Sequence, residues 1–131
     1  MKTLIVEDDF TSRLLLQELL KSYGPSHVAV NGKEAVEAVR LALEAGEPYD
    51  LICLDIMMPE MDGQAALRNI RAQEEAREII SSSGAKIVMT TALADRGNVI
   101  EAAKNHCDGF LVKPIQKERL INELRKLKLI S

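Results

Sequence analysis

The chain has 131 residues, of which 47% are hydrophobic and 28% are charged, and its formal net charge is -3. This length fits one domain with a single substantial core. The slight acidity argues against nucleic acid as a direct partner, because binding a nucleic-acid backbone requires a concentrated basic surface. No apolar stretch approaches the roughly 20 residues that cross a bilayer, so we expect no membrane span. The N-terminus turns acidic after Leu4-Ile5-Val6, unlike a secretory signal, and a cytoplasmic protein is the default expectation.

Short apolar runs alternate with amphipathic stretches along the chain. The first half predicts a strand over 4–6, a helix over 11–23 with Thr11 or Ser12 as N-cap, a strand over 27–30, a helix after Asn31-Gly32, and a strand over 51–54. The second half predicts a helix after Gly63, a strand over 87–89, a helix capped by Asp95, a strand over 110–112, and a final helix carrying Leu120, Leu124 and Leu127. Such alternation implies one α/β domain over 1–131, doubly wound, with a parallel sheet covered on both faces.

Residues capable of chemistry follow four of these strands. They are Asp8 and Asp9 after the first strand, Asp55 after the third, Thr90-Thr91 after the fourth, and Lys113 after the fifth. The carboxyl edge of such a sheet is where α/β folds bind ligands. Clustered carboxylates repel one another and favour a hard divalent cation; Mg²⁺ fits best because it keeps room for waters and phosphate oxygens. The pattern therefore predicts phosphoryl transfer to or from Asp55, with Mg²⁺ and an ammonium neutralising charge.

The sequence resembles, over its whole length, the receiver domain of bacterial response regulators, which act in two-component signalling. The resemblance rests on the acidic pair Asp8-Asp9, on Leu54-Asp55-Ile56-Met57-Met58-Pro59 followed by Met61-Asp62-Gly63, on Thr91-Ala92, and on Lys113-Pro114. It implies a flavodoxin-like fold, in which a five-stranded parallel sheet of order 2-1-3-4-5 is flanked by five helices. It also implies a cis bond between Lys113 and Pro114.

The same resemblance implies roles for the acidic residues. Asp55 is expected to accept a phosphoryl group from a phosphohistidine. Asp9 is expected to ligate Mg²⁺ directly and Asp8 directly or through water, with Asp55 and the backbone carbonyl of Met57 completing the protein's share of the ligands.

Other positions are expected to respond to the phosphoryl group or to flank it. Thr91 is preferred over Thr90 as the responding hydroxyl, with Lys113 as its charge partner, and Phe110 falls at the position of the rotameric switch aromatic. The resemblance also implies that Met57 and Leu93 flank the path of water toward the phosphoryl group. Neither side chain can orient an attacking water, so we predict a comparatively long-lived phosphate.

We therefore expect a stand-alone phosphorylation switch rather than an enzyme acting on outside substrates. A histidine kinase or a phosphotransfer protein would supply the phosphoryl group, and the output would be contact with an unknown downstream protein, by a monomer or a phosphorylation-dependent dimer. The alternatives are a receiver excised from a longer protein, a small phosphohydrolase with an aspartate nucleophile, and a nucleotide- or flavin-binding domain. The phosphohydrolase is disfavoured because Met57 stands where such enzymes usually carry an acid-base aspartate.

Overall fold

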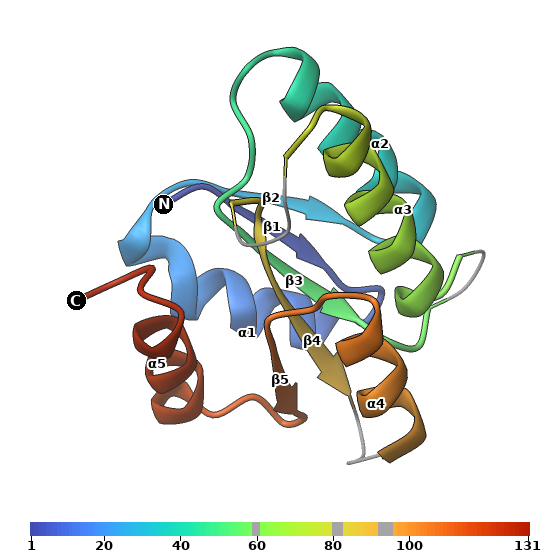
Figure 1. The fold of residues 1–131 in the computed structure, drawn as a ribbon. Helices are drawn as coiled ribbons and strands as arrows, with labels where there is room; N and C mark the ends of the chain where they lie inside the picture. Colours follow the sequence, from blue (N-terminus) through green and yellow to red (C-terminus); the bar gives the residue numbers. More distant parts are fainter. Residues whose placement is uncertain (59–60, 80–82, 92–95) are drawn as a thin grey trace.

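The computed structural model describes residues 1–58, 61–79, 83–91 and 96–131 of the chain. It confirms the predicted fold class and strand order. The sheet order is β2-β1-β3-β4-β5, all pairs are parallel, and the strands are β1 (Thr3–Val6), β2 (Ser26–Ala29), β3 (Leu51–Asp55), β4 (Lys86–Thr91) and β5 (Gly109–Val112). The helices are α1 (Phe10–Leu20), α2 (Gly32–Glu44), α3 (Gly63–Ala76), α4 (Arg96–Lys104) and α5 (Lys117–Lys126), with a 3-10 turn at Lys21–Tyr23 (Figure 1).

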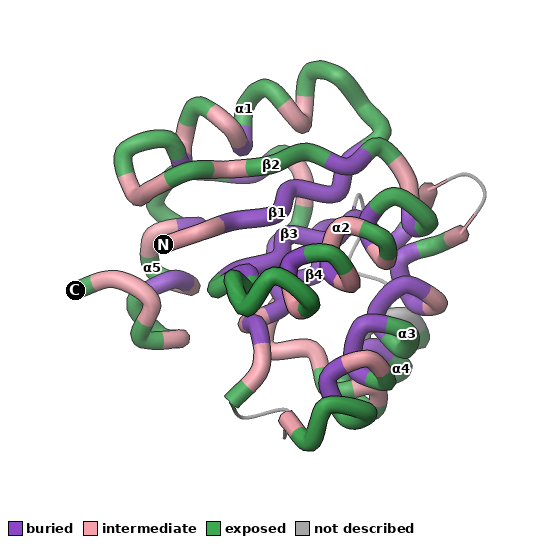
Figure 2. The backbone as a smooth tube through the Cα atoms, turned by 90° about the horizontal axis from the view of Figure 1, so that it is seen from above, coloured by how far each residue is buried: buried purple, intermediate pink, exposed green. Residues whose placement is uncertain are grey.

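The sheet separates two apolar layers. Alternate strand residues face α2, α3 and α4 on one side, including Leu4, Val6, Ile52, Leu54, Ile87 and Met89. The intervening residues face α1 and α5, including Ile5, Leu51, Cys53, Val88 and Leu111. Figure 2 shows the central strands as a buried band between these helical layers. Strands buried on both faces read as continuous apolar runs, which is why the sequence pattern located them.

Several element boundaries differ from the sequence-based expectation. The N-cap of α1 is Asp9, whose side chain accepts a hydrogen bond from the Ser12 N–H, and not Thr11 or Ser12. Strand β4 continues through Thr90 and Thr91 because both are paired with neighbouring strands. The predicted cap at Asp95 lies outside the described residues. Among the described helices, none combines the length and apolarity needed to cross a membrane.

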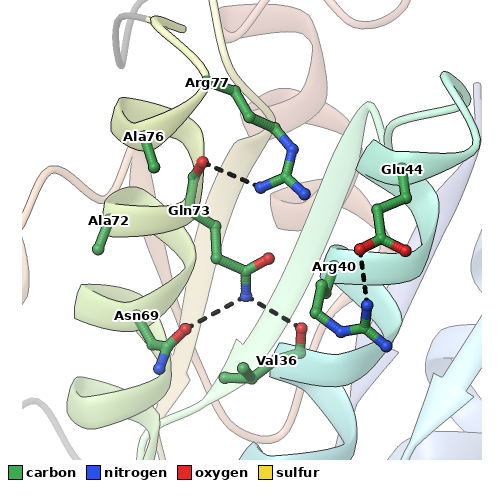
Figure 3. A pocket seen from close by; sticks show the side chains of 8 residues that line it. All are labelled: Val36, Arg40, Glu44, Asn69, Ala72, Gln73, Ala76 and Arg77. Atoms are coloured by element: carbon green, nitrogen blue, oxygen red, sulfur yellow. Dashed lines mark hydrogen bonds and ion pairs between the residues drawn. The ribbon is translucent and has the colours of Figure 1, made fainter.

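Helices α2 and α3 pack side by side and leave a shallow groove of about 430 Å³ between them (Figure 3). Gln73 of α3 bridges the two helices, because its Nε2 donates to the Val36 carbonyl at 3.1 Å and to Asn69 Oδ1 at 3.2 Å. Arg40 on the α2 side is held by Glu37 and Glu44 of its own helix. Gln73 Oε1 is buried there without a hydrogen-bond partner among the described residues. None of the predicted site residues lines the groove.

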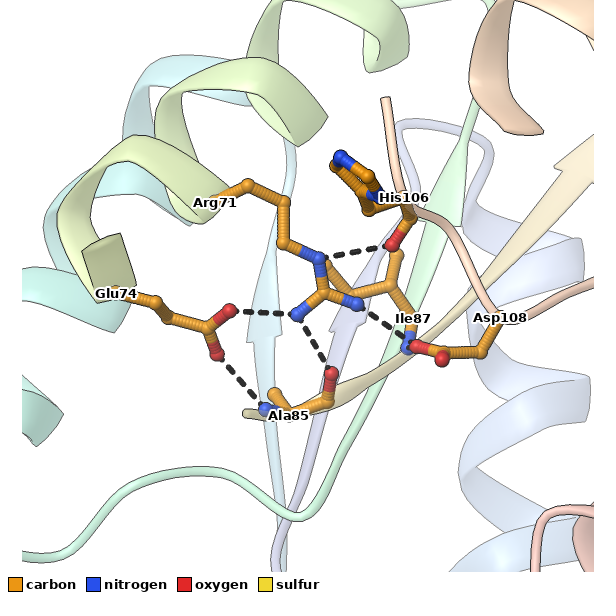
Figure 4. A network of polar contacts seen from close by, with 6 residues as sticks. All are labelled: Arg71, Glu74, Ala85, Ile87, His106 and Asp108. Atoms are coloured by element: carbon orange, nitrogen blue, oxygen red, sulfur yellow. Dashed lines mark hydrogen bonds and ion pairs between the residues drawn. The ribbon is translucent and has the colours of Figure 1, made fainter. Parts of the chain in front are cut away.

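A buried polar network closes the amino-terminal edge of the sheet (Figure 4). Arg71 of α3, which is 8% exposed, donates to Glu74 Oε1 at 2.6 Å and to Asp108 Oδ2 at 2.8 Å. It also donates to the carbonyls of His106 and Ala85, both at 2.9 Å. The two carboxylates in turn accept the backbone N–H groups of residues 85 and 87, each at 2.8 Å. One guanidinium thus joins α3 to the segments that lead into β4 and β5.

Candidate functional site

Strand periodicity brings three charged side chains to one corner of the carboxyl edge. Val6 pairs with Leu54 across β1 and β3, so Glu7 and Asp55, each one residue further on, are level with each other. Side chains alternate along a strand, and the residues two positions before Glu7, Asp55 and Lys113 all face the α1–α5 layer. The three strand ends therefore direct two carboxylates and one ammonium to the same side.

The resulting cluster contains three carboxylates and one lysine. One oxygen from each of Glu7, Asp8 and Asp55 lies within 4.8 Å of the others. The Nζ atom of Lys113 is 3.2 Å from Asp55 Oδ2 and 2.5 Å from Glu7 Oε1. Glu7 is fully buried and Asp55 is 4% exposed, whereas Asp8 is exposed. The structure thus brings together Asp8, Asp55 and Lys113, as the sequence predicted.

The structure does not bring Asp9 into this cluster. The Asp9 carboxylate accepts the Ser12 N–H at 2.8 Å as the N-cap of α1, and this hydrogen bond lowers the pKa of Asp9. The predicted role of Asp9 as a direct metal ligand is therefore corrected. An aspartate before a helix satisfies a free backbone donor, and that local interaction holds the side chain away from the other carboxylates. Glu7 takes its place beside Asp8.

Glu7 is the site residue that the motif analysis missed. The available signal was the alternation within the strands. Glu7 lies two residues past Ile5, just as Asp55 lies two residues past Cys53, and both of these apolar residues face the α1–α5 layer. A carboxylate in register with Asp55 had to come from position 7, because successive strand residues point to opposite faces.

The carboxylates and the lysine shift one another's proton affinity. Burial raises the pKa of Glu7, and the neighbouring Asp55 raises it further, while Lys113 and the Asp9 N–H act in the opposite direction. Burial alone would lower the pKa of Lys113, but Glu7 and Asp55 outweigh this and the net pKa is raised. The ammonium form of Lys113 is therefore stabilised beside an acidic site that still carries excess negative charge.

The turn after β3 is built closely against Asp55. The Met57 N–H donates to Asp55 Oδ1 at 3.2 Å, and the Gly63 N–H donates to the Ile56 carbonyl at 2.8 Å. A Cβ atom on Gly63 would lie 2.2 Å from the Asp55 carbonyl oxygen, so only glycine allows α3 to begin there. The Met57 side chain is 70% exposed beside the site, and Pro59 lies outside the described residues.

The ends of β4 and β5 are joined at the same edge. The Lys113 N–H donates to the Thr91 carbonyl at 2.7 Å, which ties the lysine to the strand that carries the predicted hydroxyl. Thr91 is 5% exposed. The Lys113–Pro114 bond is cis, which confirms the expectation from the resemblance.

Two predicted positions remain, Phe110 on β5 and Leu93. Phe110 pairs with Met89 in the β4–β5 ladder and is partly buried against the α2–α4 side of the core. Its role as a switch stays a prediction. Leu93 and Ala92 lie outside the described residues.

The donor set fits a hard divalent cation. Glu7, Asp8 and Asp55 supply three carboxylates at one point, and such oxygen ligands suit Mg²⁺. Glu7 Oε1 is buried, and its ion pair with Lys113 engages one side of this oxygen. A carboxylate oxygen has two lone pairs, so Glu7 Oε1 can accept a metal bond while it keeps its contact with Lys113.

The fold and the cluster together define a doubly wound α/β domain with an acidic site at the carboxyl edge of its sheet. A family model described as the response regulator receiver domain matches residues 3–125. A chemotaxis protein CheY of Listeria monocytogenes is 34% identical over 126 residues, which are 96% of this chain and 97% of that protein. The osmosensing histidine protein kinase SLN1 of Saccharomyces cerevisiae is 33% identical over 121 residues, 91% of this chain but 9% of the kinase.

Solved structures give the same result. The receiver domain of the histidine kinase CKI1 from Arabidopsis thaliana, complexed with Mg²⁺ and BeF3⁻, has a TM-score of 0.81 at 28% identity and covers 98% of this chain and 90% of that one. The receiver domain of the sensor histidine kinase PA1611 from Pseudomonas aeruginosa, with a magnesium ion in its active-site cleft, has a TM-score of 0.76 at 27% identity, covering 97% of both chains. The chain belongs to the response regulator receiver domain family, a class of two-component signalling domains.

Proposed function

We propose that the chain is a cytoplasmic phosphorylation switch that accepts a phosphoryl group on Asp55 in a Mg²⁺-dependent reaction. The observation that carries the proposal is the meeting of Glu7, Asp8 and Asp55 within 4.8 Å, with the Lys113 ammonium 3.2 Å from Asp55 Oδ2. The Mg²⁺ described in the CKI1 and PA1611 receiver structures supports the choice of cation.

In the proposed reaction an Asp55 oxygen forms a bond to phosphorus while the P–N bond of a donor phosphohistidine breaks. The freed imidazole nitrogen keeps the bonding electron pair and takes a proton from solvent. Lys113 stabilises negative charge that moves onto the phosphoryl oxygens, because its ammonium already contacts the acceptor carboxylate. Bound Mg²⁺, held by Glu7, Asp8, Asp55 and the Met57 carbonyl, would neutralise the remaining charge on the transferred group.

The proposal is tested with a small-molecule phosphodonor such as acetyl phosphate, with intact-mass spectrometry as the readout. We expect wild type to gain one phosphoryl group with Mg²⁺ and none with excess EDTA. Asp55→Asn should gain none in either condition. Phosphorylation of Asp55→Asn at the wild-type level, or no effect of EDTA, would refute the assignment of acceptor or metal.

The same proposal implies that the chain does not turn over outside substrates. Met57 stands two residues past Asp55, and a thioether cannot act as a general acid or base. We expect no hydrolysis of p-nitrophenyl phosphate above the rate of Asp55→Asn. Multiple turnovers that depend on Asp55 would favour the phosphohydrolase alternative instead.

The apolar side chain of Met57 also supports a long-lived acyl phosphate. It is 70% exposed at the edge of the site and offers no group that could orient an attacking water. Loss of the phosphoryl group, followed by mass after the donor is removed, should be faster in Met57→Asn and in Leu93→Glu than in wild type. Equal or slower loss in these variants contradicts the prediction.

The partners follow from this chemistry. A histidine kinase or a phosphotransfer protein would supply the phosphoryl group, and contact with a downstream protein would carry the output, through a monomer or a phosphorylation-dependent dimer. Thr91 and Phe110 would couple the new charge to the surface that this partner reads, by shifting the population of two conformations. If Thr91→Ala is phosphorylated but its backbone amide NMR signals away from the site do not shift, the result would support this coupling. A wild-type pattern of spectral changes in that variant would contradict it.

A further inference from the structure

Arg13 of α1 reaches back over the turn that supplies two of the three clustered carboxylates. Its Nη1 donates to the Glu7 carbonyl at 3.1 Å and approaches the Asp8 carbonyl at 3.5 Å. The guanidinium carbon also lies 5.5 Å from the centroid of the Phe10 ring. The arginine is thus held by an aromatic face on one side and by the two carbonyls on the other.

These carbonyls belong to the residues whose side chains define the candidate cation site. The Glu7 N–H donates to the Ala29 carbonyl at 3.0 Å, but beyond this bond the chain leaves the β1 ladder. The Asp9 N–H donates to Glu7 Oε2 at 3.2 Å, a contact within the turn itself. Arg13 adds a charged donor from α1, and hydrogen bonds to charged groups are stronger than neutral ones. It therefore fixes the backbone from which both carboxylates project.

We propose that Arg13 is a positioning residue for the cation site, which acts by holding the backbone of Glu7 and Asp8. The inference rests on the proposed Mg²⁺ site. A positioning role and simple electrostatics predict opposite changes in Mg²⁺ affinity when Arg13 is removed, so an experiment can distinguish them. An arginine beside a cation site repels the cation, so removing its charge alone would strengthen Mg²⁺ binding. If the arginine instead positions the ligands, removing it weakens Mg²⁺ binding despite the relief of repulsion.

The experiment measures the Kd for Mg²⁺ by NMR titration of the backbone amides at constant ionic strength. Arg13→Met removes both the charge and the donors. We expect its Kd for Mg²⁺ to be about tenfold higher than that of wild type, which is the lower end of the loss in affinity seen when residues that orient metal ligands are removed. Arg13→Gln removes the charge but keeps an amide donor, and we expect its Kd to lie between those of Arg13→Met and wild type. Arg40→Met on α2, which also removes an arginine charge, is the control and should bind Mg²⁺ like wild type.

The outcomes separate this inference from the proposed function. If wild type binds no Mg²⁺, the proposed function itself fails. If wild type binds and Arg13→Met binds equally well or more tightly, the positioning role alone is overturned. Circular dichroism without Mg²⁺ shows which variants are folded, and if Arg13→Met unfolds, Arg13→Gln decides by the same criterion.

Discussion

The two edges of the sheet handle buried charge in opposite ways. At the amino-terminal edge, Arg71 bonds to two carboxylates and two carbonyls, and the carboxylates also accept backbone N–H groups (Figure 4). At the carboxyl edge, Lys113 pairs with Glu7 and Asp55, and Asp8 adds a third carboxylate within 4.8 Å of these two. The first cluster is satisfied within the chain, and the second leaves negative charge for a ligand to neutralise.

This difference separates a structural role from a functional one. A buried ion pair whose hydrogen bonds are all formed holds together the segments that it joins. Removing one partner lowers the free energy of unfolding strongly, because the other charge stays buried without its partner. A cluster with excess charge of one sign lowers the stability of the fold, because its like charges repel one another. A ligand of opposite charge relieves this repulsion when it binds, so it binds the folded state favourably and stabilises it. Changes at the two edges should therefore move stability in different directions.

The largest expected effect is at the satisfied edge. Arg71→Met leaves Glu74 buried without its cation, and we expect the free energy of unfolding to fall by about 3–5 kcal/mol, as for other broken buried pairs. Urea denaturation followed by circular dichroism measures this. Arg40→Met, which breaks only exposed pairs within α2, is the matched control and should lose less than about 1 kcal/mol. Similar losses in both variants would contradict a structural role for the Arg71 network.

The second prediction concerns ligand binding at the unsatisfied edge. Mg²⁺ at 100 times its Kd should raise the free energy of unfolding by about 2.7 kcal/mol, if it binds only the folded chain. Thermal unfolding with and without MgCl2, at matched ionic strength, measures the gain. Arg71→Met should keep the same Mg²⁺-dependent gain, because its network lies where β4 begins, at the other edge of the sheet. Loss of the gain in that variant would show that the two edges are not independent.

The third prediction is that removing a site charge stabilises the chain without Mg²⁺. Burial and Asp55 raise the pKa of Glu7, so the folded state disfavours its charged form. Glu7→Gln should raise the free energy of unfolding by about 1 kcal/mol at pH 7 in EDTA, while abolishing stabilisation by Mg²⁺.

The pH dependence of the stability gain in Glu7→Gln follows from the raised pKa of Glu7. Wild type has the full stability contribution of Glu7 below the ordinary pKa of 4.5 and loses it as the pH rises through the folded-state pKa. The gain in Glu7→Gln should therefore shrink as the pH falls toward 4.5. A variant that is less stable than wild type at pH 7 would mean that the ion pair with Lys113 outweighs burial.

The sequence predicted the carboxyl edge better than the amino edge, and the reason is physical. Asp55 and Lys113 each end an apolar run, so strand geometry and the resemblance both located them. The error by one residue at Asp9 arose because three acids in a row contain both a helix cap and two cluster residues. The register of β1 against β3 and the cap of α1 are needed to show that Glu7 and Asp8 belong to the cluster and that Asp9 is the cap.

The network around Arg71 had no sequence signal. Arg71 lies on a helix, where an arginine is ordinarily exposed, and Asp108 precedes a glycine, as turn residues do. Their ion pair joins residues 37 positions apart and forms only once the chain has folded so that α3 lies beside the segments that lead into β4 and β5. Pairing between strands likewise extended β4 through Thr91, beyond the apolar run that predicted it.

The smallest effect is expected where charge is not buried at all. Arg68 of α3 and Glu101 of α4 form an ion pair at 3.2 Å, and both side chains are 50% exposed. Because water solvates both partners, Arg68→Gln should lower the free energy of unfolding by no more than about 0.5 kcal/mol. A double-mutant cycle with Glu101→Gln isolates the pair, and its coupling should fall further in 1 M salt. A coupling energy near the loss of about 3–5 kcal/mol expected for Arg71→Met would mean that contacts between helices, and not burial, decide how much a charged pair stabilises this fold.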